Sequence, residues 1–198
     1  MAPFVRLSRN PHKQLMWIWL SKLMRESRSY QRGLDLACGD LKTFKYFQTR
    51  GYVGVDTDES RVIYAREKFG VPVIVSKLEE MPDTLSGDFV VCLQTIGFNK
   101  YFELSHAVEV ICRCTKATAA KGMLILNAAG LSPQQFAESE ALLRNGFETV
   151  EVRHYGLTST YVPKVFSLLL AGLWRVFPSL AKRNDCPAWL FICRNREG

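Results

Sequence analysis

Two turns that each follow a short apolar run carry the strongest chemical signal in the sequence. Gly39 and Asp40 follow the run 33–38, and Asp56 follows the run 52–55, 17 residues beyond Gly39. A glycine in the first turn lets a ligand approach the backbone, and the free amides of a following helix bind a carboxylate or phosphate. A carboxylate at the second turn can accept hydrogen bonds from both hydroxyls of a ribose, each worth about 1.5–3 kcal/mol. Together the turns favour a cofactor that contains a nucleoside.

Each turn also has a purely structural interpretation. Gly39 is a lone glycine, and one glycine is equally typical of a tight turn that binds nothing. Asp56 is placed to cap a helix that begins near Glu59, although Asp58 is just as well placed for that task. One carboxylate can cap a helix and bind a ribose at the same time, so both interpretations stay open at this point.

Strands and helices alternate along the chain around these turns. Short apolar runs predict strands at 33–38, 52–55, 72–75, 88–93, 123–126, 147–154 and 188–193, and helical spacing predicts helices at 12–28, 43–50, 59–69 and 101–118. Such alternation predicts an α/β protein with helices on both faces of a mostly parallel sheet. The carboxyl ends of parallel strands meet at one edge of the sheet, which brings Gly39 and Asp56 together.

The length and composition predict one domain over residues 1–198. A single core holds up to about 250 residues, and 47% of this chain is apolar. We expect a helical lead-in over 1–30 and an apolar helical insert over 156–187, between the sixth and seventh strands. Its most apolar part, 161–178, is interrupted by charges and too short to span a membrane. We expect a helix packed over the substrate crevice, with a membrane-surface helix as the alternative.

The charge balance favours an anionic partner. The 26 Lys and Arg outnumber the 19 Asp and Glu, for a net charge of +7, which suits a phosphorylated substrate, a membrane surface or RNA. The six cysteines form no CxxC pair and no cluster with zinc spacing, so we expect no metal and free thiols in a reducing cytosol. The apolar run 15–20 is too short for a secretory signal. We therefore predict a cytoplasmic protein and leave peripheral membrane contact open.

Residues 33–40 and 51–56 resemble the first two motifs of class I S-adenosylmethionine-dependent methyltransferases. The resemblance covers about 33–194 and includes weaker motifs at 78–82 and 145–148. It implies a Rossmann-like, seven-stranded, mostly parallel sheet with helices on both faces and an antiparallel last strand. It also implies S-adenosyl-L-methionine as the cofactor, whereas NAD-binding Rossmann proteins need the GxGxxG pattern that this turn lacks.

The resemblance implies a role for each matching residue of the cofactor site. Asp35, Ala37 and Gly39 would contact the methionine moiety, Asp56 and Thr57 the ribose, Lys77 and Leu78 the adenine, and Gln94 the reactive sulfonium. Two positions depart from the family pattern. Leu41 stands where a further glycine is usual, and Lys77 stands where an acidic residue often binds the adenine amino group. Because lysine has no acceptor, we expect the backbone at Leu78 and apolar contacts to hold the adenine.

Methyl transfer is an in-line displacement, and holding the reacting groups in line can contribute about 7–11 kcal/mol. A hydroxyl acceptor also needs a base, and His154 and His106 are the candidate catalytic residues. We favour His154 because it ends a predicted strand near the ligand crevice, although a packing or solvent-exposed histidine is the commoner case. The Asn/Asp-Pro-Pro-aromatic signature of methyltransferases that modify nucleic-acid amino groups is absent after residue 93, which disfavours a nucleic-acid partner.

The turn at 38–42, the run 52–56 and the apolar segment also resemble a bacterial subgroup linked to cell-surface glycan synthesis. That resemblance implies O-methylation of a sugar or glycan-type acceptor, including one on a lipid-linked carrier whose pyrophosphate suits the positive charge. A hydrophobic small-molecule metabolite suits the apolar segment equally well. The remaining alternatives are a non-catalytic S-adenosylmethionine-binding module and an RNA methyltransferase, ranked last because the basic residues are scattered.

Overall fold

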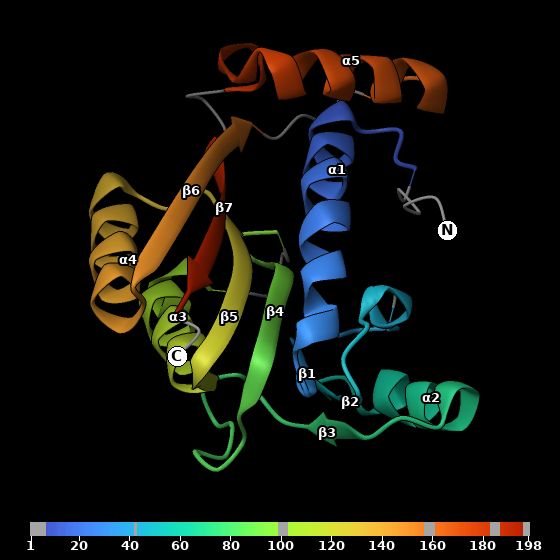
Figure 1. Cartoon of the computed structure of the whole chain (residues 1–198), viewed down its shortest axis with the longest axis vertical. Helices are drawn as coiled ribbons and strands as arrows, with labels where there is room; N and C mark the ends of the chain where they lie inside the picture. The colour runs from blue at the N-terminus through green and yellow to red at the C-terminus, as the bar shows by residue number, and fades with distance from the viewer. Residues whose placement is uncertain (1–6, 42, 99–102, 157–160, 183–186, 196–198) are drawn as a thin grey trace.

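The computed structural model describes residues 7–41, 43–98, 103–156, 161–182 and 187–195 (Figure 1). Within these ranges the strands are β1 (Arg32–Leu36), β2 (Gly51–Asp56), β3 (Val73–Val75), β4 (Gly87–Ile96), β5 (Thr118–Ala129), β6 (Thr149–Gly156) and β7 (Pro187–Arg194). The α-helices are α1 (Pro11–Glu26), α2 (Glu59–Phe69), α3 (Ala107–Lys116), α4 (Pro133–Gly146) and α5 (Lys164–Val176). Short 3-10 helices η1 (Ser27–Ser29), η2 (Phe44–Tyr46), η3 (Leu104–His106) and η4 (Pro178–Ala181) connect them.

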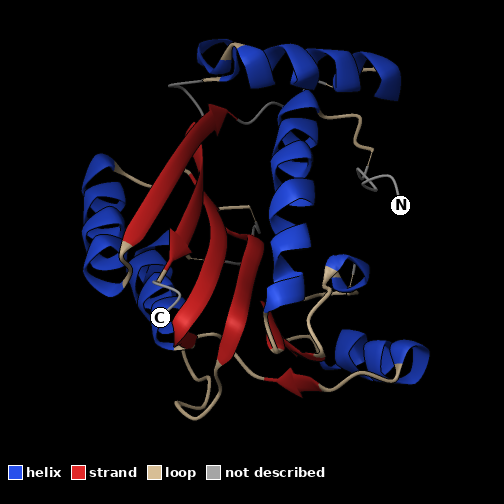
Figure 2. Ribbon diagram, in the orientation of Figure 1, coloured by secondary structure: helices blue, strands red, loops and turns tan. Residues whose placement is uncertain are grey.

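The described strands form one seven-stranded sheet in the order β3-β2-β1-β4-β5-β7-β6. The pairs from β3 to β5 are parallel, and β7 runs antiparallel to β5 and to β6. Helices cover both faces, with α1 in front of the sheet and α3 and α4 behind it (Figure 2). The prediction of a Rossmann-like, mostly parallel sheet with an antiparallel last strand is therefore confirmed.

Strand β4 shows why the central strands are apolar along their whole length. Phe89 and Val91 pack against the α1 side of the sheet, whereas Val90 and Cys92 pack against the α3 and α4 side. Side chains alternate between the faces of a strand, and each of these four is fully buried. A strand covered on both faces needs apolar residues at every position, which explains the uninterrupted run in the sequence.

The helix caps settle one question that the sequence leaves open. The side chain of Asp58 accepts a hydrogen bond from the amide of Arg61 and caps α2, and Gly70 ends that helix in the left-handed conformation. Asp56 therefore does not serve as this cap. Its carboxylate is available for the turn that follows β1.

Three elements differ from the predictions. The helix expected over 43–50 is reduced to η2, because the amide of Gln48 donates to Ser27 Oγ instead of to a helical carbonyl. Helix α4 was not predicted, since Leu143 is the one large apolar side chain that it buries completely. The helix expected over 101–118 is described as η3 and α3 and ends at Lys116, whereas residues 101–102 lie outside the described ranges.

Gly97, directly after β4, supplies a stability test. It has φ +73°, and a Cβ there would lie 1.8 Å from the carbonyl oxygen of Ala129. Gly70 has a similar φ of +63° but no atom within 4 Å of such a Cβ. We expect Gly70→Ala to cost about 1–2 kcal/mol of unfolding free energy from backbone strain alone, and Gly97→Ala to cost clearly more because backbone must move. Urea unfolding of both variants measures this, and equal losses would contradict the clash.

Candidate functional site

A cavity of about 480 Å³ opens at the carboxyl ends of β1, β2 and β4. It is lined by Ala37, Gly39, Asp56, Thr57, Asp58, Arg61, Ser76, Lys77, Leu78, Glu79, Gln94 and Thr95. In this sheet β1 lies between β2 and β4, so the chain reverses its direction of winding here. Open α/β sheets bind ligands at this switch point, and the volume lies within the range of about 300–1,000 Å³ that is usual for small-molecule sites.

The carboxylate of Asp56 joins the two turns predicted from the sequence. Its Oδ2 accepts a hydrogen bond of 2.7 Å from the amide of Gly39, and its Oδ1 accepts one of 3.0 Å from the amide of Asp58. The carboxylate is largely buried, at 8% exposure. A carboxylate has about four acceptor positions, so two bonds to the backbone leave capacity for a ligand hydroxyl.

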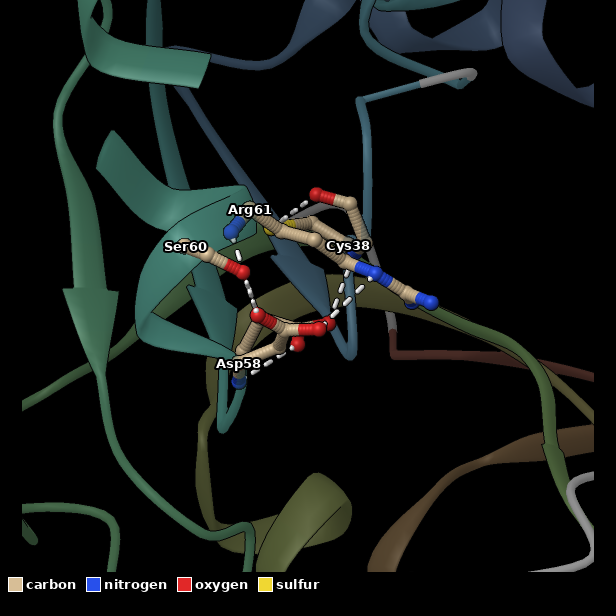
Figure 3. A network of polar contacts seen from close by, with 6 residues as sticks. Cys38, Asp58, Ser60 and Arg61 are labelled. Atoms are coloured by element: carbon tan, nitrogen blue, oxygen red, sulfur yellow. Dashed lines mark hydrogen bonds and ion pairs between the residues drawn. The ribbon is translucent and has the colours of Figure 1, made fainter. Parts of the chain in front are cut away.

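Arg61 adds a cation that the sequence reasoning did not anticipate. Its Nε lies 3.1 Å from Asp58 Oδ2, and Asp58 also accepts from Ser60 Oγ at 2.5 Å, as Figure 3 shows. The hydrogen bond from Ser60 is the main cause that lowers the pKa of Asp58. The guanidinium lies beside the turn, 3.6 Å from where a Cβ on Gly39 would stand. In the sequence, the feature that could have indicated this role is the position of Arg61 in the first turn of α2, three residues after the Asp58 cap.

Backbone strain concentrates around the cavity. Ala37, Leu41 and Gln94 have φ of 56°, 54° and 59°, and they are the non-glycine residues with positive φ in the described part of the chain. Such conformations cost about 1–3 kcal/mol each and gather at functional sites. Leu41 thus adopts the backbone conformation of the glycine expected at its position, and its side chain is buried in a small cluster with Val62 and Ala65.

A buried hydrogen-bonded chain holds the strained backbone at Gln94. The amide of Gln94 donates to Asn127 Oδ1 at 2.6 Å, and Asn127 Nδ2 donates to the hydroxyl of Tyr155 at 3.0 Å. Asn127 is fully buried and Tyr155 almost so. Asn127 is the polar residue in the otherwise apolar run of β5, a signal that the sequence interpretation did not use.

Asp35 lies behind the cavity, outside its lining. Its Oδ2 accepts hydrogen bonds from Thr43 Oγ1 and from the hydroxyl of Tyr52 at 3.0 Å. Burial raises the pKa of Asp35 to about 7, against the lowering effect of these two donors. The carboxyl therefore braces the turn after β1 from within the core, and its contact with a methionine moiety stays a prediction.

The two histidines are not brought together with the predicted cofactor residues. His106 is half exposed in η3, with Nδ1 3.6 Å from Glu79 Oε1, and lies outside the cavity lining. His154 stacks on Trp189 at 5.8 Å, and its pKa is lowered by burial and then by Lys182. It borders a different cleft, on the α1 side of β6. A role as base remains a prediction for both.

A smaller hollow of about 240 Å³ shares Gln94 with the main cavity. It is lined by Asn10, Lys13, Met16, Gln94, Phe98, Tyr155 and Tyr161. These residues come from the start of α1, the end of β4 and the turn after it, the end of β6, and the segment before α5, so no local pattern in the sequence could group them. The hollow offers space for a second molecule on the far side of Gln94.

Helix α5 does not cover either space in the expected way. It packs across the start of α1, where Trp174 contacts His12 with 4.5 Å between ring centroids, and α5 side chains line neither the cavity nor the small hollow. Among the helices of the described ranges, none combines the length and apolarity needed to cross a bilayer. Those same ranges contain no group of three or more His, Cys, Asp or Glu that could hold a metal ion.

Comparison with solved structures identifies the fold. The chain is similar to a SAM-dependent methyltransferase from Archaeoglobus fulgidus, with a TM-score of 0.58 and 15% identity over 95% of each chain. It is also similar to the N-methyltransferase NodS from Bradyrhizobium japonicum, with a TM-score of 0.58 and 11% identity over 94% of each chain. The cyclopropane synthase MmaA2 from Mycobacterium tuberculosis gives a TM-score of 0.58 and 14% identity over 90% of this chain and 84% of that chain.

These likenesses show that the chain has the Rossmann-like fold of class I methyltransferases. No protein-family model matches the sequence, and no curated protein matches it significantly. The named activities of the similar structures differ from one another. The shared fold therefore does not indicate an acceptor, because proteins with one fold differ in function through the residues of their sites.

The raised pKa of Asp35 predicts a pH-dependent stability. An unfolded aspartate ionises at about pH 4, whereas the folded carboxyl keeps its proton up to about pH 7. Between these values the folded state binds more protons, so the stability contributed at Asp35 falls as pH rises. Asparagine stays neutral and can still accept from Thr43 and Tyr52. Asp35→Asn should therefore lose less stability than wild type between about pH 5 and about pH 8, by about 2–3 kcal/mol.

Urea unfolding at the two pH values measures this difference, with Asp83→Asn as the control because Asp83 is 84% exposed. The same pH dependence in wild type and Asp35→Asn would show that the buried carboxyl is ionised throughout.

Proposed function

We propose that this chain is an S-adenosylmethionine-dependent methyltransferase that uses the cavity at β1, β2 and β4 for its cofactor. The observation that carries the proposal is the Asp56 carboxylate, bonded to the Gly39 amide at 2.7 Å and set in the wall of that cavity. The largely buried carboxylate of Asp56 lies beside the turn at Gly39, which has no bulky side chain, at the switch point of the sheet. Such a site suits a nucleoside with a charged amino-acid tail. The fold of the similar structures supports the same cofactor.

The cavity offers a partner for each part of S-adenosylmethionine. Asp56 and Thr57 would hold the ribose hydroxyls, and the turn at Ala37 and Gly39 leaves room for the methionine moiety. The guanidinium of Arg61 lies beside that turn and suits the carboxylate of the amino-acid tail. The residues present therefore fit the cofactor at its polar end.

The adenine end fits through a residue other than Lys77. Lys77 and Glu79 both line the cavity. Lys77 is paired with Glu80 at 2.7 Å and its side chain is 64% exposed, whereas the side chain of Glu79 is only 25% exposed. Glu79 therefore supplies the acceptor that lysine cannot offer to the adenine amino group. Leu78 provides the apolar contact beside it, since its side chain belongs to the core cluster.

When bound, S-adenosylmethionine supplies an electrophilic methyl group. Gln94 belongs to both the cofactor cavity and the small hollow, so it lies where donor and acceptor must meet. The Asn127 side chain fixes the backbone there, which preserves the alignment that in-line transfer needs. Burial raises the pKa of Tyr155, so its hydroxyl stays neutral and can orient an acceptor without removing a proton.

We further propose that the acceptor is a sugar or glycan-type hydroxyl held in the small hollow. Polar groups of Asn10, Lys13 and Tyr155 stand there beside the rings of Phe98 and Tyr161. Hydrogen-bonding groups next to aromatic faces suit a ring that carries hydroxyls on its edges and C–H groups on its faces. A purely hydrophobic acceptor could not form hydrogen bonds with these groups.

Ligand-dependent stabilisation tests the cofactor. We expect S-adenosylmethionine and S-adenosylhomocysteine, but not NAD or ATP, to stabilise the wild type by about 2.7 kcal/mol at about 100 times their Kd. Asp56→Ala should bind them at least about tenfold more weakly, because it removes hydrogen bonds to a charged acceptor. Thermal-shift titration measures both effects.

Asp83→Ala is the control for that titration, since Asp83 is exposed, is paired with Arg113 and is not part of the cavity lining. Unchanged cofactor affinity in Asp56→Ala would remove Asp56 from the site and with it the methyltransferase proposal.

The acceptor class is tested by methyl transfer to a panel of saccharides, lipid-linked saccharides and hydrophobic phenols, read by mass spectrometry. We expect a saccharide hydroxyl to gain the methyl group. Tyr155→Phe should lower kcat/KM for that acceptor about tenfold, since one hydrogen bond is lost, and change the Kd for S-adenosylhomocysteine by a clearly smaller factor, because Tyr155 reaches the cofactor cavity only through Asn127. Tyr64→Phe, on the exposed side of α2, should change neither value.

Transfer to the phenols alone would replace the glycan acceptor by a hydrophobic metabolite. Cofactor binding without transfer to any member of the panel would favour the non-catalytic binding module.

A further inference from the structure

Helix α5 turns its large apolar side chains away from the protein. Within this fully described helix, Ser167 and Ala171 are the buried residues, both of them small. Six large apolar residues of α5 and the turn after it are more than half exposed: Val165, Phe166, Leu169, Val176, Phe177 and Leu180. We call these six the apolar face of α5. Figure 1 shows the helix at the top of the molecule, where it lies across the N-terminal end of α1 as an outer element.

The orientation is the reverse of an ordinary surface helix. Such a helix buries its apolar stripe against the core and exposes its polar side. Here Ser167 and Ala171 are the buried residues and Trp174 packs against the core beside them, while the six large side chains named above remain in water. Exposed apolar patches of this kind mark surfaces that contact a membrane or another protein.

The charges around the apolar face indicate whether it suits a membrane or another protein. The stretch 164–182 contains no Asp or Glu, and its charged residues are Lys164, Arg175 and Lys182. Arg175 and Lys182 form no ion pair with any carboxylate in the described part of the chain. A two-fold dimer through this face would bring like charges together, whereas an anionic surface would neutralise them.

A basic cleft of about 670 Å³ adjoins the C-terminal end of α5. Cationic side chains from α1, β6, α5 and the end of η4 line it: Lys22, Arg25, Arg153, Arg175 and Lys182. Its lining includes one carboxylate, Glu151, which is paired with Arg153 at 2.7 Å. The cleft therefore keeps an excess of positive charge that suits phosphate groups.

We propose that the apolar face of α5 docks on an anionic phospholipid bilayer, with the helix lying in the plane of the headgroups. A helix of 13 residues cannot span a bilayer but has the length and one-sided apolar face of an interfacial helix. The apolar side chains enter the headgroup–acyl boundary, and Arg175 and Lys182 with the basic cleft contact headgroup phosphates. This docking does not depend on the methyltransferase proposal.

The docking has a consequence for the acceptor that does rest on the proposed function. Tyr161 lines the small hollow directly before α5, and the amide of Val162 donates to the carbonyl of Arg9 at 3.0 Å, next to Asn10 at the start of α1. The hollow therefore lies beside the N-terminal end of the docked helix. A bilayer-bound acceptor would reach it without leaving the membrane surface.

Vesicle co-sedimentation of the full chain tests the docking. We expect binding to phosphatidylcholine vesicles that contain about 30% phosphatidylglycerol, and weaker binding to pure phosphatidylcholine. The double variant Phe166→Ser with Leu169→Ser should bind the anionic vesicles at least about tenfold more weakly. The matched control is Ile63→Ser with Tyr64→Ser, two similarly large side chains exposed on α2, which should bind as the wild type does.

A second variant keeps the test decisive if the first one misfolds. Arg175→Gln with Lys182→Gln should reduce binding to the anionic vesicles and flatten its decrease with salt, while binding to pure phosphatidylcholine stays the same. Free glycerol phosphate should not compete, because a soluble phosphate has no apolar part for α5. Competition by glycerol phosphate would assign the cleft to a soluble ligand instead.

Failure of the wild type to bind anionic vesicles, or equal binding by the α5 and α2 variants, would overturn the proposal. A concentration-dependent dimer in sedimentation velocity that is lost in the α5 variant would assign the face to a second copy of the chain. Because none of these measurements uses S-adenosylmethionine, their failure is distinguishable from failure of the proposed function.

Discussion

The Asp56 carboxylate is the interaction on which the candidate site depends. It accepts hydrogen bonds from the Gly39 amide after β1 and from the Asp58 amide after β2. These bonds connect the turns that follow two different strands, and together the turns form one wall of the cavity. Bonds to a charged acceptor are about twice as strong as neutral ones. Because Asp58 caps α2 independently, Asp56 remains free to join the turns and to face a ligand.

Rigid packing behind the site maintains backbone conformations that would otherwise relax. Ala37 and Gln94 both line the cavity with positive φ. Asp35 braces the first of these turns through Tyr52, and Asn127 braces the second through the Gln94 amide. Strained residues persist where surrounding structure over-determines them, and buried hydrogen bonds that are fully satisfied provide that constraint.

The cavity and the α5 surface differ in what they expose. The cavity end presents acids and amides within a packed wall, whereas α5 presents large apolar side chains with cations around them. The small hollow lies between, and Gln94 and Tyr161 mark its two sides. Under the proposed function, a donor in the cavity and an acceptor in the small hollow would meet at Gln94, which lines both spaces.

The sequence by itself determined the sheet, most of its helical cover apart from α4, and the two turns, because strand periodicity and the chemistry of Gly39 and Asp56 are local properties. It did not determine which way the apolar segment faces, since 161–178 has large residues on one side and small ones on another, and only packing against α1 decided that the small side is buried. The link from Gln94 through Asn127 to Tyr155 was also decided by tertiary structure. These side chains lie far apart in the chain, and contacts between distant segments leave no periodic trace in the sequence.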